Sequence, residues 1–502
     1  MDIESSVTRR GLLRGVTATT GTSLASNQLT DSVKSDVTSV DNAQKSGRWD
    51  HVQHTIARTG YRPNYSMDSS LTKKWRFKPE EDPVIYLSPV VADGTIVAPN
   101  RDGPLYAVDA QTGNEQWRFE NKRFGPPAIA GGKVHAGTED PGLYAFDLGS
   151  GEVVWKQTFD RDSGGPQITS FLERRAPLVQ DDIVYHQDYT HIRALDAQTG
   201  KVRWTERHSQ GLGTPTRYQG PAAADGIIFV SGYGSFNYPD IKALDSATGE
   251  VLWTFATPAN DDRSFHDSLS APTVRGNMVY FGAAWGGVYA LDANTGEKLW
   301  RAMSESIYTS PAVTESTVFV GYTNTQVAEK FDGHGIIAYD RKTGTKRWTV
   351  DLSKDKAGQR ISGGPIVVGN TVFILAAGDL FAVDRNSGEV KETVSVGGDE
   401  VSAPAFVDGT VFIGGGGIVA VGEPDNGPTS ELGNGGGEGN ESTGGGNISG
   451  NGQNTKNEEN RSSGGIAVGD VCYICLLFLL LLFLLLVLLY RQFNEEDDEE
   501  DN

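Results

Sequence analysis

Cysteine is almost absent from this chain of 502 residues. Cys472 and Cys475 are the two that it has, and both lie in or beside a long apolar run near the C-terminus. The residues before Cys472 therefore contain no disulfide and no thiolate metal site, so their stability has to come from packing. No thioredoxin-like βαβ pattern surrounds the Cys-x-x-Cys pair, which argues against a redox or metal-binding role for it.

Recognisable reaction motifs are also missing. The sequence has no Gly-x-Ser-x-Gly, no phosphate loop and no His-Glu-x-x-His. Asp160–Gly164 is similar to the start of a calcium loop but lacks the third ligand and the distal glutamate, which favours a solvated acidic loop. We interpret His186 and His191 as two surface or turn histidines, because a spacing of five in a strand–loop region need not put them on one face. The sequence thus predicts no catalytic residue and no metal ligand.

Basic charge is scarce. Asp and Glu total 65 against 44 Lys and Arg, a net charge of −21, and the run 495–501 alone contributes seven of the negative charges. An acidic surface of this kind repels a phosphate backbone, so the composition argues against a nucleic-acid partner. The same acidity, with arginine in excess of lysine, indicates solubility at high salt, and we expect a halophilic archaeal source.

The chain does have one box in many copies. Asp-x-x-Thr/Ser-Gly, followed four residues later by Trp, begins at Asp109, Asp147, Asp196, Asp245, Asp292 and Asp340. A seventh copy at Asp384 has Glu392 in place of the tryptophan. The glycine permits a positive φ and the Asp and Thr oxygens accept backbone N–H groups, so each box predicts a tight turn. The tryptophan then opens an outer strand, where it can wedge between neighbouring units of a repeat protein.

A second landmark, a proline that opens a hydrophobic run, occurs eight times at intervals of 38 to 54 residues: Pro89, Pro127, Pro177, Pro221, Pro272, Pro311, Pro365 and Pro404. Four short strands fit this spacing, so we predict an all-β fold, an eight-bladed β-propeller of four-stranded blades over residues 49–423. Lys73–Phe77 is predicted to be an outer strand and Gly417–Val421 an inner strand of one blade, whose pairing closes the ring. Seven blades is the alternative, if these terminal strands do not pair.

The box Ala-x-Asp-x-x-Thr-Gly-x-x-x-Trp resembles the repeat of the pyrroloquinoline quinone (PQQ) propeller superfamily, over about residues 73–422. That family includes quinoprotein dehydrogenases and non-enzymatic, BamB-type scaffold lipoproteins of outer-membrane assembly. The enzymes hold a quinone, a calcium or similar ion and a catalytic carboxylate, and the alcohol-oxidising branch covers its ring with a disulfide between adjacent cysteines. Because the predicted propeller has no cysteine and no long insertion, the resemblance favours the non-enzymatic branch with no cofactor, and PQQ is the alternative.

The N-terminus carries a targeting feature. Thr8–Arg14 resembles a twin-arginine signal, the alternative being a basic leader without that role. We therefore assign residues 1–30 to a signal region and residues 31–48 to a linker. Whether the signal is cleaved is left open.

The C-terminus predicts a membrane anchor. Residues 424–469 are rich in Gly, Asn, Glu and Ser and are expected to form a disordered, flexible stalk, with glycosylation sequons at Asn440, Asn447 and Asn460. Residues 470–491 contain an apolar run long enough for one transmembrane helix, and Arg491 favours a cytoplasmic position for the acidic tail 492–502. Together with export of the N-terminus, this predicts a single-pass protein of the cell membrane with the propeller outside.

Candidate binding residues lie three positions before each repeated proline, where they are expected to surround one mouth of the channel. Several are aromatic or cationic, the types that dominate binding hot spots, and long connections lie beside them. The alternative is that these side chains plug and pack the axial funnel. The eight positions are Tyr86, Phe124, Arg174, Tyr218, Leu269, Tyr308, Ser362 and Val401, and our candidates for a binding face are Tyr86, Phe124, Arg174, Arg175, Tyr218 and Tyr308.

The sequence therefore favours a membrane-anchored extracellular propeller that binds a protein or peptide partner at the cell envelope. A PQQ-dependent dehydrogenase or related redox enzyme is the alternative, and a purely structural envelope component is a third reading. The repeat identifies an architecture that enzymes and scaffolds share, so whether this chain is an enzyme stays open, with the balance against it.

Overall fold

The computed structural model describes residues 47–424 except 66, 68–69, 80–86, 102, 121, 139–141, 161–174, 189, 208–219, 232–240, 258–268, 284–285, 303–306, 308, 325–332, 354–360, 362 and 398–401. The chain divides into two units, 1–428 and 429–502, and every described residue belongs to the first. The predicted signal region, most of the stalk, the transmembrane helix and the acidic tail lie outside the described residues. Within the described part, no helix has the length and apolarity needed to cross a membrane.

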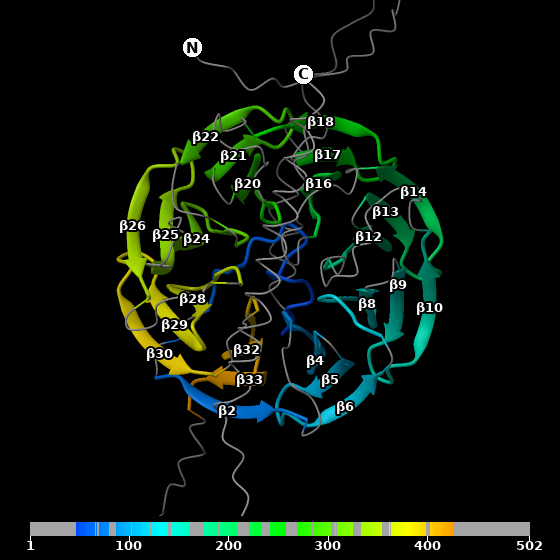
Figure 1. The fold of residues 1–502 in the computed structure, drawn as a ribbon, viewed down its shortest axis with the longest axis horizontal. Helices are drawn as coiled ribbons and strands as arrows, with labels where there is room; N and C mark the ends of the chain where they lie inside the picture. Colours follow the sequence, from blue (N-terminus) through cyan, green and yellow to red (C-terminus); the bar gives the residue numbers. More distant parts are fainter. Residues whose placement is uncertain are drawn as a thin grey trace, which may run out of the picture. The chain divides into compact units, whose positions relative to one another are not determined.

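The described residues fold into eight blades around a central axis (Figure 1), as the proline spacing predicted. We letter the strands of each blade a to d from the axis outward. In chain order the first four blades are β3 (Val90–Ala92), β4 (Thr95–Pro99), β5 (Leu105–Asp109) and β6 (Glu115–Phe119); β7 (Ala128–Ala130), β8 (Lys133–Thr138), β9 (Gly142–Asp147) and β10 (Val153–Thr158); β11 (Leu178–Gln180), β12 (Ile183–Gln187), β13 (His191–Asp196) and β14 (Val202–Arg207); and β15 (Ala222–Ala224), β16 (Ile227–Ser231), β17 (Ile241–Asp245) and β18 (Val251–Phe255).

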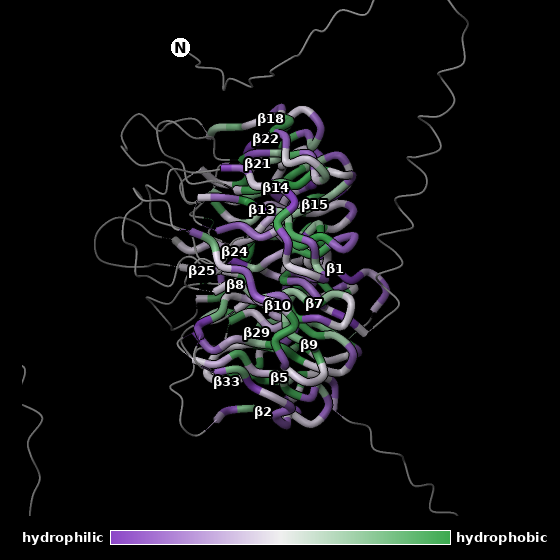
Figure 2. Tube along the Cα trace, turned by 90° about the vertical axis from the view of Figure 1, so that its right-hand side faces the viewer, coloured by the Kyte–Doolittle hydropathy of each residue, from purple (hydrophilic) through white to green (hydrophobic). Residues whose placement is uncertain are grey.

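The second half of the ring repeats the pattern. Blades 5 to 8 are β19 (Thr273–Arg275), β20 (Met278–Ala283), β21 (Gly287–Asp292) and β22 (Lys298–Ala302); β23 (Ala312–Val313), β24 (Thr317–Asn324), β25 (Gly333–Asp340) and β26 (Lys346–Asp351); β27 (Ile366–Val368), β28 (Thr371–Ala376), β29 (Asp379–Asp384) and β30 (Val390–Ser395); and β31 (Ala405–Val407), β32 (Thr410–Gly415), β33 (Gly417–Gly422) and β2 (Thr72–Phe77). Strands a and b of every blade are largely buried, and the side view shows hydrophobic residues along the strands (Figure 2).

Blade 8 is completed from both ends of the ring. Strand β2 pairs antiparallel with β33, with Trp75 opposite Ala420 and Phe77 opposite Ile418. The alternative of seven blades is therefore wrong. Pairing the terminal strands covers an edge of the last sheet that would otherwise present free N–H and C=O groups.

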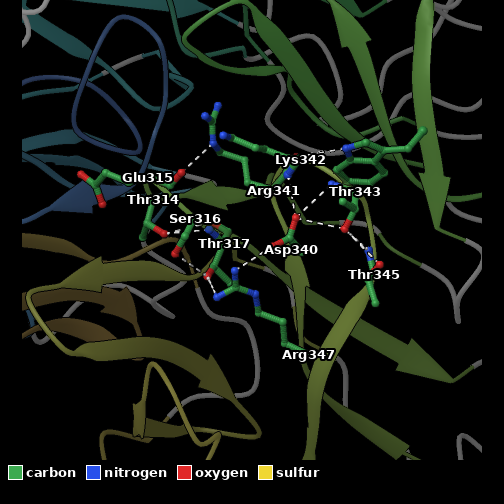
Figure 3. A network of polar contacts seen from close by, with 11 residues as sticks. Thr314, Glu315, Ser316, Thr317, Asp340, Arg341, Lys342, Thr343, Thr345 and Arg347 are labelled. Carbon is green, nitrogen blue, oxygen red and sulfur yellow. Dashed lines mark hydrogen bonds and ion pairs between the residues drawn. The ribbon is translucent and has the colours of Figure 1, made fainter.

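The repeated box forms the tight c-to-d turn that its residues predict. In blade 6, one carboxylate oxygen of Asp340 accepts hydrogen bonds from the backbone N–H groups of Lys342 and Thr343 and from the Thr343 hydroxyl, each at 3.0 Å (Figure 3). Its other oxygen accepts from Arg347 at 2.8 Å. The hydrogen bond from Arg347, with those from the turn, lowers the pKa of Asp340 to about 2.

Each tryptophan docks on the box of the following blade. The ring of Trp300 lies over Gly344, whose φ is +69° and whose hypothetical Cβ would be 2.6 Å from the indole. The Trp300 N–H donates to the carbonyl of Arg341 at 3.0 Å. The equivalent donors and acceptors are Trp117 and Leu148, Trp155 and Ala197, Trp204 and Ser246, Trp253 and Ala293, and Trp348 and Arg385. Only glycine fits under the indole, so the repeat encodes the contact between blades.

Glu392 is the informative exception. A tryptophan at this position would have to dock on a box in blade 8, but the c and d strands of that blade come from opposite ends of the ring, so no c-to-d turn joins them. Instead, both carboxylate oxygens of Glu392 lie 2.8 Å from the backbone nitrogen of Leu71, just before β2. The glutamate fixes the entry of the closing strand.

The sequence did not predict the segment 47–65, which lies inside the ring, along the first strand of every blade. In Figure 1 it is the blue segment near the centre. Its residues Tyr61–Arg62 form β1, which pairs parallel with β27 as a fifth strand of blade 7. Trp49 is fully buried, and Arg58 is 2% exposed. We call residues 47–65 the axial segment.

The axial segment accepts hydrogen bonds from the innermost strands of seven blades. The N–H groups of Val91, Ile129, Ala223, Val274, Val313, Val367 and Gly369 donate to carbonyls of residues 49–62 at 2.7–2.9 Å. At blade 3 the acceptor is a side chain, because the N–H of Val179 donates to Nε2 of His51 at 3.1 Å. In blade 8, Tyr65 packs edge-on against Phe406, with ring centroids 4.8 Å apart. One segment thus satisfies backbone donors all around the axis.

The burial of His135 predicts that the free energy of unfolding falls at acid pH. It is completely buried, both ring nitrogens lack a hydrogen-bond partner, and burial lowers its pKa to about 3 from 6.5. Between these two pH values the histidine binds a proton in the unfolded chain but not in the folded ring. The contribution of the buried neutral imidazole to stability is therefore complete above pH 6.5 and is lost as the pH falls toward 3. Each unit of pKa corresponds to about 1.4 kcal/mol, so the loss is a few kcal/mol.

The matched variant is His135→Phe. Six other blades have an aromatic residue at this place in strand b, as at Phe229 or Phe319, opposite the same alanine of strand c. We expect the variant to lose less free energy of unfolding than the wild type between neutral pH and pH about 4.5, measured by urea titration. Parallel pH profiles would contradict the assignment.

Candidate functional site

The two faces of the ring carry different connections. The a-to-b and c-to-d turns lie on one face, and the b-to-c connections and the longer d-to-a connections lie on the other. We call these the turn face and the loop face. Of the six predicted binding residues, Phe124 and Arg175 are described and belong to d-to-a connections of the loop face, whereas Tyr86, Arg174, Tyr218 and Tyr308 lie outside the described residues.

The two described candidates are buried. Phe124 pairs with Thr138 at the end of strand b of its own blade and packs between Phe119 of blade 1 and Tyr144 and Phe146 of blade 2. Leu269, the described equivalent in blade 5, pairs in the same way with Ala283 and is also buried. At these two positions the side chain packs in the body of the ring. Arg175 is 1% exposed. A binding face built from the six residues stays a prediction.

Comparison of equivalent positions in the eight blades shows one position at which blades 3 and 4 differ from the other six. The fourth residue of strand b pairs in every blade with the residue just before the repeated alanine of strand c, and this pair is apolar in six blades, as in Phe281 with Tyr289. In blade 3 the pair is His186 with Arg193, and in blade 4 it is Val230 with Lys242. The fold does not need charge here, because six blades are built without it. Charged groups at equivalent positions of two neighbouring blades point to function.

The blade-3 cluster is compact and closed. His186 is 1% exposed and stacks on Phe159, with ring centroids 5.8 Å apart, and the Arg193 guanidinium carbon lies 4.2 Å above the same ring. Asp188 pairs with Arg193. Burial is the largest effect on His186 and lowers its pKa to about 4; the nearby Asp188 opposes this change, and Arg193 and Arg175 add to it. The ion pair with Arg193, hydrogen bonds and the nearby His186 outweigh burial and lower the pKa of Asp188.

Polar contacts continue from blade 3 into blade 4. The Gln187 amide donates to the carbonyl of Ser231 at 2.7 Å. Lys242 donates to Glu206 at 3.0 Å and to the carbonyl of Arg207 at 2.6 Å. These groups lie at the loop-face ends of their strands. We call blades 3 and 4 at this face the polar sector.

The two histidines interpreted from the sequence both lie in blade 3. His186 is not a surface or turn histidine: it lies in β12 and is buried, so that prediction was wrong. The signal was the repeat itself, since His186 stands in β12 where the other blades have an apolar residue. His191 opens β13 and is half-buried, its Nδ1 2.8 Å from the Thr190 hydroxyl. Of the loop Asp160–Gly164, only Asp160 is described.

Residues 49–62 run along the innermost strands around the axis, where the indole of Trp49 stacks on His54 with ring centroids 4.5 Å apart. That face of Trp49 is therefore not free to stack on a planar quinone. Among the residues that the structure describes, no three His, Cys, Asp or Glu side chains are grouped as a metal site.

Comparison with known proteins gives one family. The model described as "Outer membrane protein assembly factor BamB" matches residues 9–236, 101–326 and 237–431, which together cover most of the chain. The BamB of Burkholderia pseudomallei (strain K96243) is 25% identical over 259 residues, 46% of this chain and 62% of that protein. The chain spans less than two thirds of the length of the curated relatives that it matches.

Solved structures share the fold. BamB from Moraxella catarrhalis superimposes with a TM-score of 0.53 at 18% identity, over 71% of this chain and 99% of that one. The quinohemoprotein alcohol dehydrogenase ADHIIG from Pseudomonas putida HK5 has a TM-score of 0.60 at 17% identity, over 76% of this chain and 81% of that one. At these identities the likeness establishes architecture alone.

Proposed function

We propose, from the premise that this chain belongs to the family of the outer membrane protein assembly factor BamB, that it is a scaffold that captures a protein or peptide partner on its loop face. The observation that carries the proposal is the polar sector. Charged side chains are buried at the loop-face ends of blades 3 and 4, at places where other blades are apolar. Loops carried on a rigid scaffold are common sites of recognition.

The location belongs to the same proposal. A twin-arginine-type signal, the stalk 424–469 and the apolar run within 470–491 would put the ring outside the cell membrane on a single span, in an acidic protein suited to a halophilic archaeon. The described chain enters and leaves the ring together, which suits anchoring from one side. Gly47 lies against Asp408, and Gly422 lies against Gly409, at the same turn of blade 8.

The test of the scaffold is partner capture. Substituting Arg174, Arg175 and Tyr218 together by alanine is expected to abolish recovery of crosslinked partners from intact membranes. Because Arg175 is buried, the double variant Arg174→Ala/Tyr218→Ala separates binding from folding, and its melting temperature should match the wild type. A matched control replaces Lys201 and Lys342 in turns of the opposite face. Undiminished capture by both variants would refute the proposal.

A quinone-dependent redox enzyme is the competing function, because the similar solved structures include a quinohemoprotein alcohol dehydrogenase. Purified protein would be incubated with PQQ and calcium and examined for quinone absorbance and for dye-linked oxidation of alcohols and sugars. Bound quinone with turnover would replace the scaffold proposal. No retained absorbance after desalting is the result that we expect, because the axial segment covers the innermost strands that line the channel and His54 covers one face of Trp49.

A further inference from the structure

We infer that His51 is a pH-sensitive fastening of the axial segment: its neutral imidazole holds the segment on blade 3, and its protonation releases the segment there. The groups involved are the imidazole of His51, the carboxylate of Asp50 and the backbone N–H of Val179, which we call the latch. The latch is independent of the proposed scaffold function, because it concerns how the ring holds a segment of its own chain.

The attachment at blade 3 differs from those at six other blades. In blades 1, 2 and 4 to 7, a residue of the innermost strand donates its N–H to a backbone carbonyl of residues 49–60, as Ile129 does to Asp50. The corresponding N–H of blade 3, that of Val179, donates to Nε2 of His51 at 3.1 Å. A carbonyl accepts at any pH near neutrality, whereas an imidazole nitrogen that binds a proton becomes a donor. Of these seven attachments, the one at blade 3 is therefore the titratable one.

The backbone of the axial segment turns away from blade 3 at the latch. The His54 N–H donates to the His51 carbonyl at 2.9 Å, and the Gly60 N–H donates to the Gln53 carbonyl at 2.9 Å. Gln53 and His54 have φ values of +62° and +74°, left-handed conformations that side chains other than glycine adopt at a cost. Because these carbonyls are used within the turn, a side chain supplies the acceptor for Val179, and it holds a strained turn against the ring.

The two hydrogen bonds of His51 fix its protonation state. A backbone N–H can only donate, so Nε2 of His51 is the acceptor for Val179 and carries no proton. Nδ1 then carries the proton of the neutral ring and lies 2.9 Å from Oδ1 of Asp50. The side chain is buried. A second proton can bind only at Nε2, where it would face the Val179 N–H, so protonation replaces an attraction between the segment and blade 3 by a repulsion.

The carboxylate of Asp50 favours the protonated ring. Burial raises the pKa of Asp50, but the nearby His51, His54 and Arg48 outweigh burial and keep the pKa below its ordinary value. Asp50 therefore stays ionised in mild acid and can pair with an imidazolium. The contact that orients the neutral ring thus also stabilises the charged ring once it has left Val179.

Two neighbouring histidines stay neutral at pH about 5 in the folded ring. Burial lowers the pKa of His54 to about 4 and that of His135, in β8, to about 3, and His51 adds to both changes. The innermost strand of blade 3, Leu178–Gln180, has no titratable side chain of its own. The other groups that act on these two histidines are Arg62 and Asp50 at His54, and Lys133 at His135.

Hydrogen–deuterium exchange of the full-length protein tests the latch. The protection of the Val179 N–H, relative to the unprotected exchange rate at the same pH, should fall by about tenfold or more between pH about 7.5 and pH about 5. The Val367 N–H of blade 7 is the internal reference, because its acceptor is the carbonyl of Gly60. A wild type in which the protection of these two amides keeps the same ratio at both pH values would overturn the latch.

Two variants assign the effect to His51. His51→Gln can offer an amide oxygen to Val179 and does not titrate, so its protection ratio should not depend on pH. Asp50→Asn keeps an acceptor for Nδ1 but removes the charge that stabilises the imidazolium, so the loss should need a lower pH than in the wild type; this variant is informative even if His51→Gln fails to fold. The matched control His135→Phe should keep the acid-induced loss. A loss that persists in His51→Gln, or a midpoint unmoved in Asp50→Asn, would refute the role of His51.

Discussion

Deleting residues 47–62 is expected to abolish the cooperative unfolding transition of the ring, whereas deleting residues 1–46 leaves that transition unchanged. The first deletion removes the acceptors that the innermost strands of seven blades use. The second removes none of these acceptors. The two truncations are therefore a matched pair that differ by one segment.

The magnitude follows from what would be left unpaired. A hydrogen bond contributes about 1 kcal/mol net, but a buried N–H that loses its acceptor costs about 1–3 kcal/mol. Eight such donors face the axis, at Val91, Ile129, Val179, Ala223, Val274, Val313, Val367 and Gly369. Their sum reaches the whole stability of an ordinary domain, about 5–15 kcal/mol. Water entering the channel could restore part of this but would also reach the apolar innermost strands.

The measurement is circular dichroism during heating, combined with limited proteolysis. We expect the 47–62 deletion to show a broad, low transition and rapid cleavage throughout the ring. A melting temperature within a few degrees of the wild type would mean that the axial segment is an accessory and that the innermost strands do not depend on its acceptors. Adding a synthetic peptide of residues 47–65 to the deleted protein should recover part of the transition.

The repeat was predictable because each box contains both partners of a contact. Gly344 and Trp300 lie in neighbouring units, and their spacing recurs in every copy, so periodicity reveals the interface between blades. Even the break at Glu392 was visible as a missing tryptophan. Its cause was not, because the binding of Leu71 depends on how the ring closes.

The axial segment was not predictable for a physical reason. It is held through backbone carbonyls, which leave no residue pattern, and Gln53, His54 and Arg58 adopt left-handed conformations that no glycine signals. Trp49 was the available clue, a tryptophan outside the box pattern that proved to be fully buried. Candidate residues before the prolines were placed at the channel mouth by analogy between blades. Phe124 shows that a register position there can belong to the packing between blades.

The polar sector could be recognised only from the sequence repeat and the structure together. Symmetry fixes what an ordinary blade needs, so departures such as His186 and Arg193 stand out only after the strands are aligned by their observed pairing. Arg58 then connects the sector to the axis. A sequence repeat is thus most informative about function where the structure shows it to be broken.

Deleting Leu71–Phe77 is the second change expected to have a large effect: it should open the ring, lower the melting temperature by more than ten degrees or so, and promote aggregation. The deletion removes β2, exposes the edge of β33, and takes the Trp75 indole away from Gly113 of blade 1. Loss of the half-buried Trp75 costs less than the about 3–5 kcal/mol of a fully buried tryptophan, but an uncovered edge strand also recruits other chains.

A rescue separates closure from simple loss of residues. The sequence of residues 71–78 would be placed after Gly422 through a copy of the turn Asp109–Gly113, so that blade 8 becomes one continuous β-meander like the others. We expect this permuted chain to regain a single cooperative transition and to stay monomeric by light scattering. Closure would be irrelevant to stability if the simple deletion melted like the wild type. If the graft failed to restore the transition, the position of β2 in the chain, ahead of the ring and tied by Glu392, would itself be what stabilises blade 8.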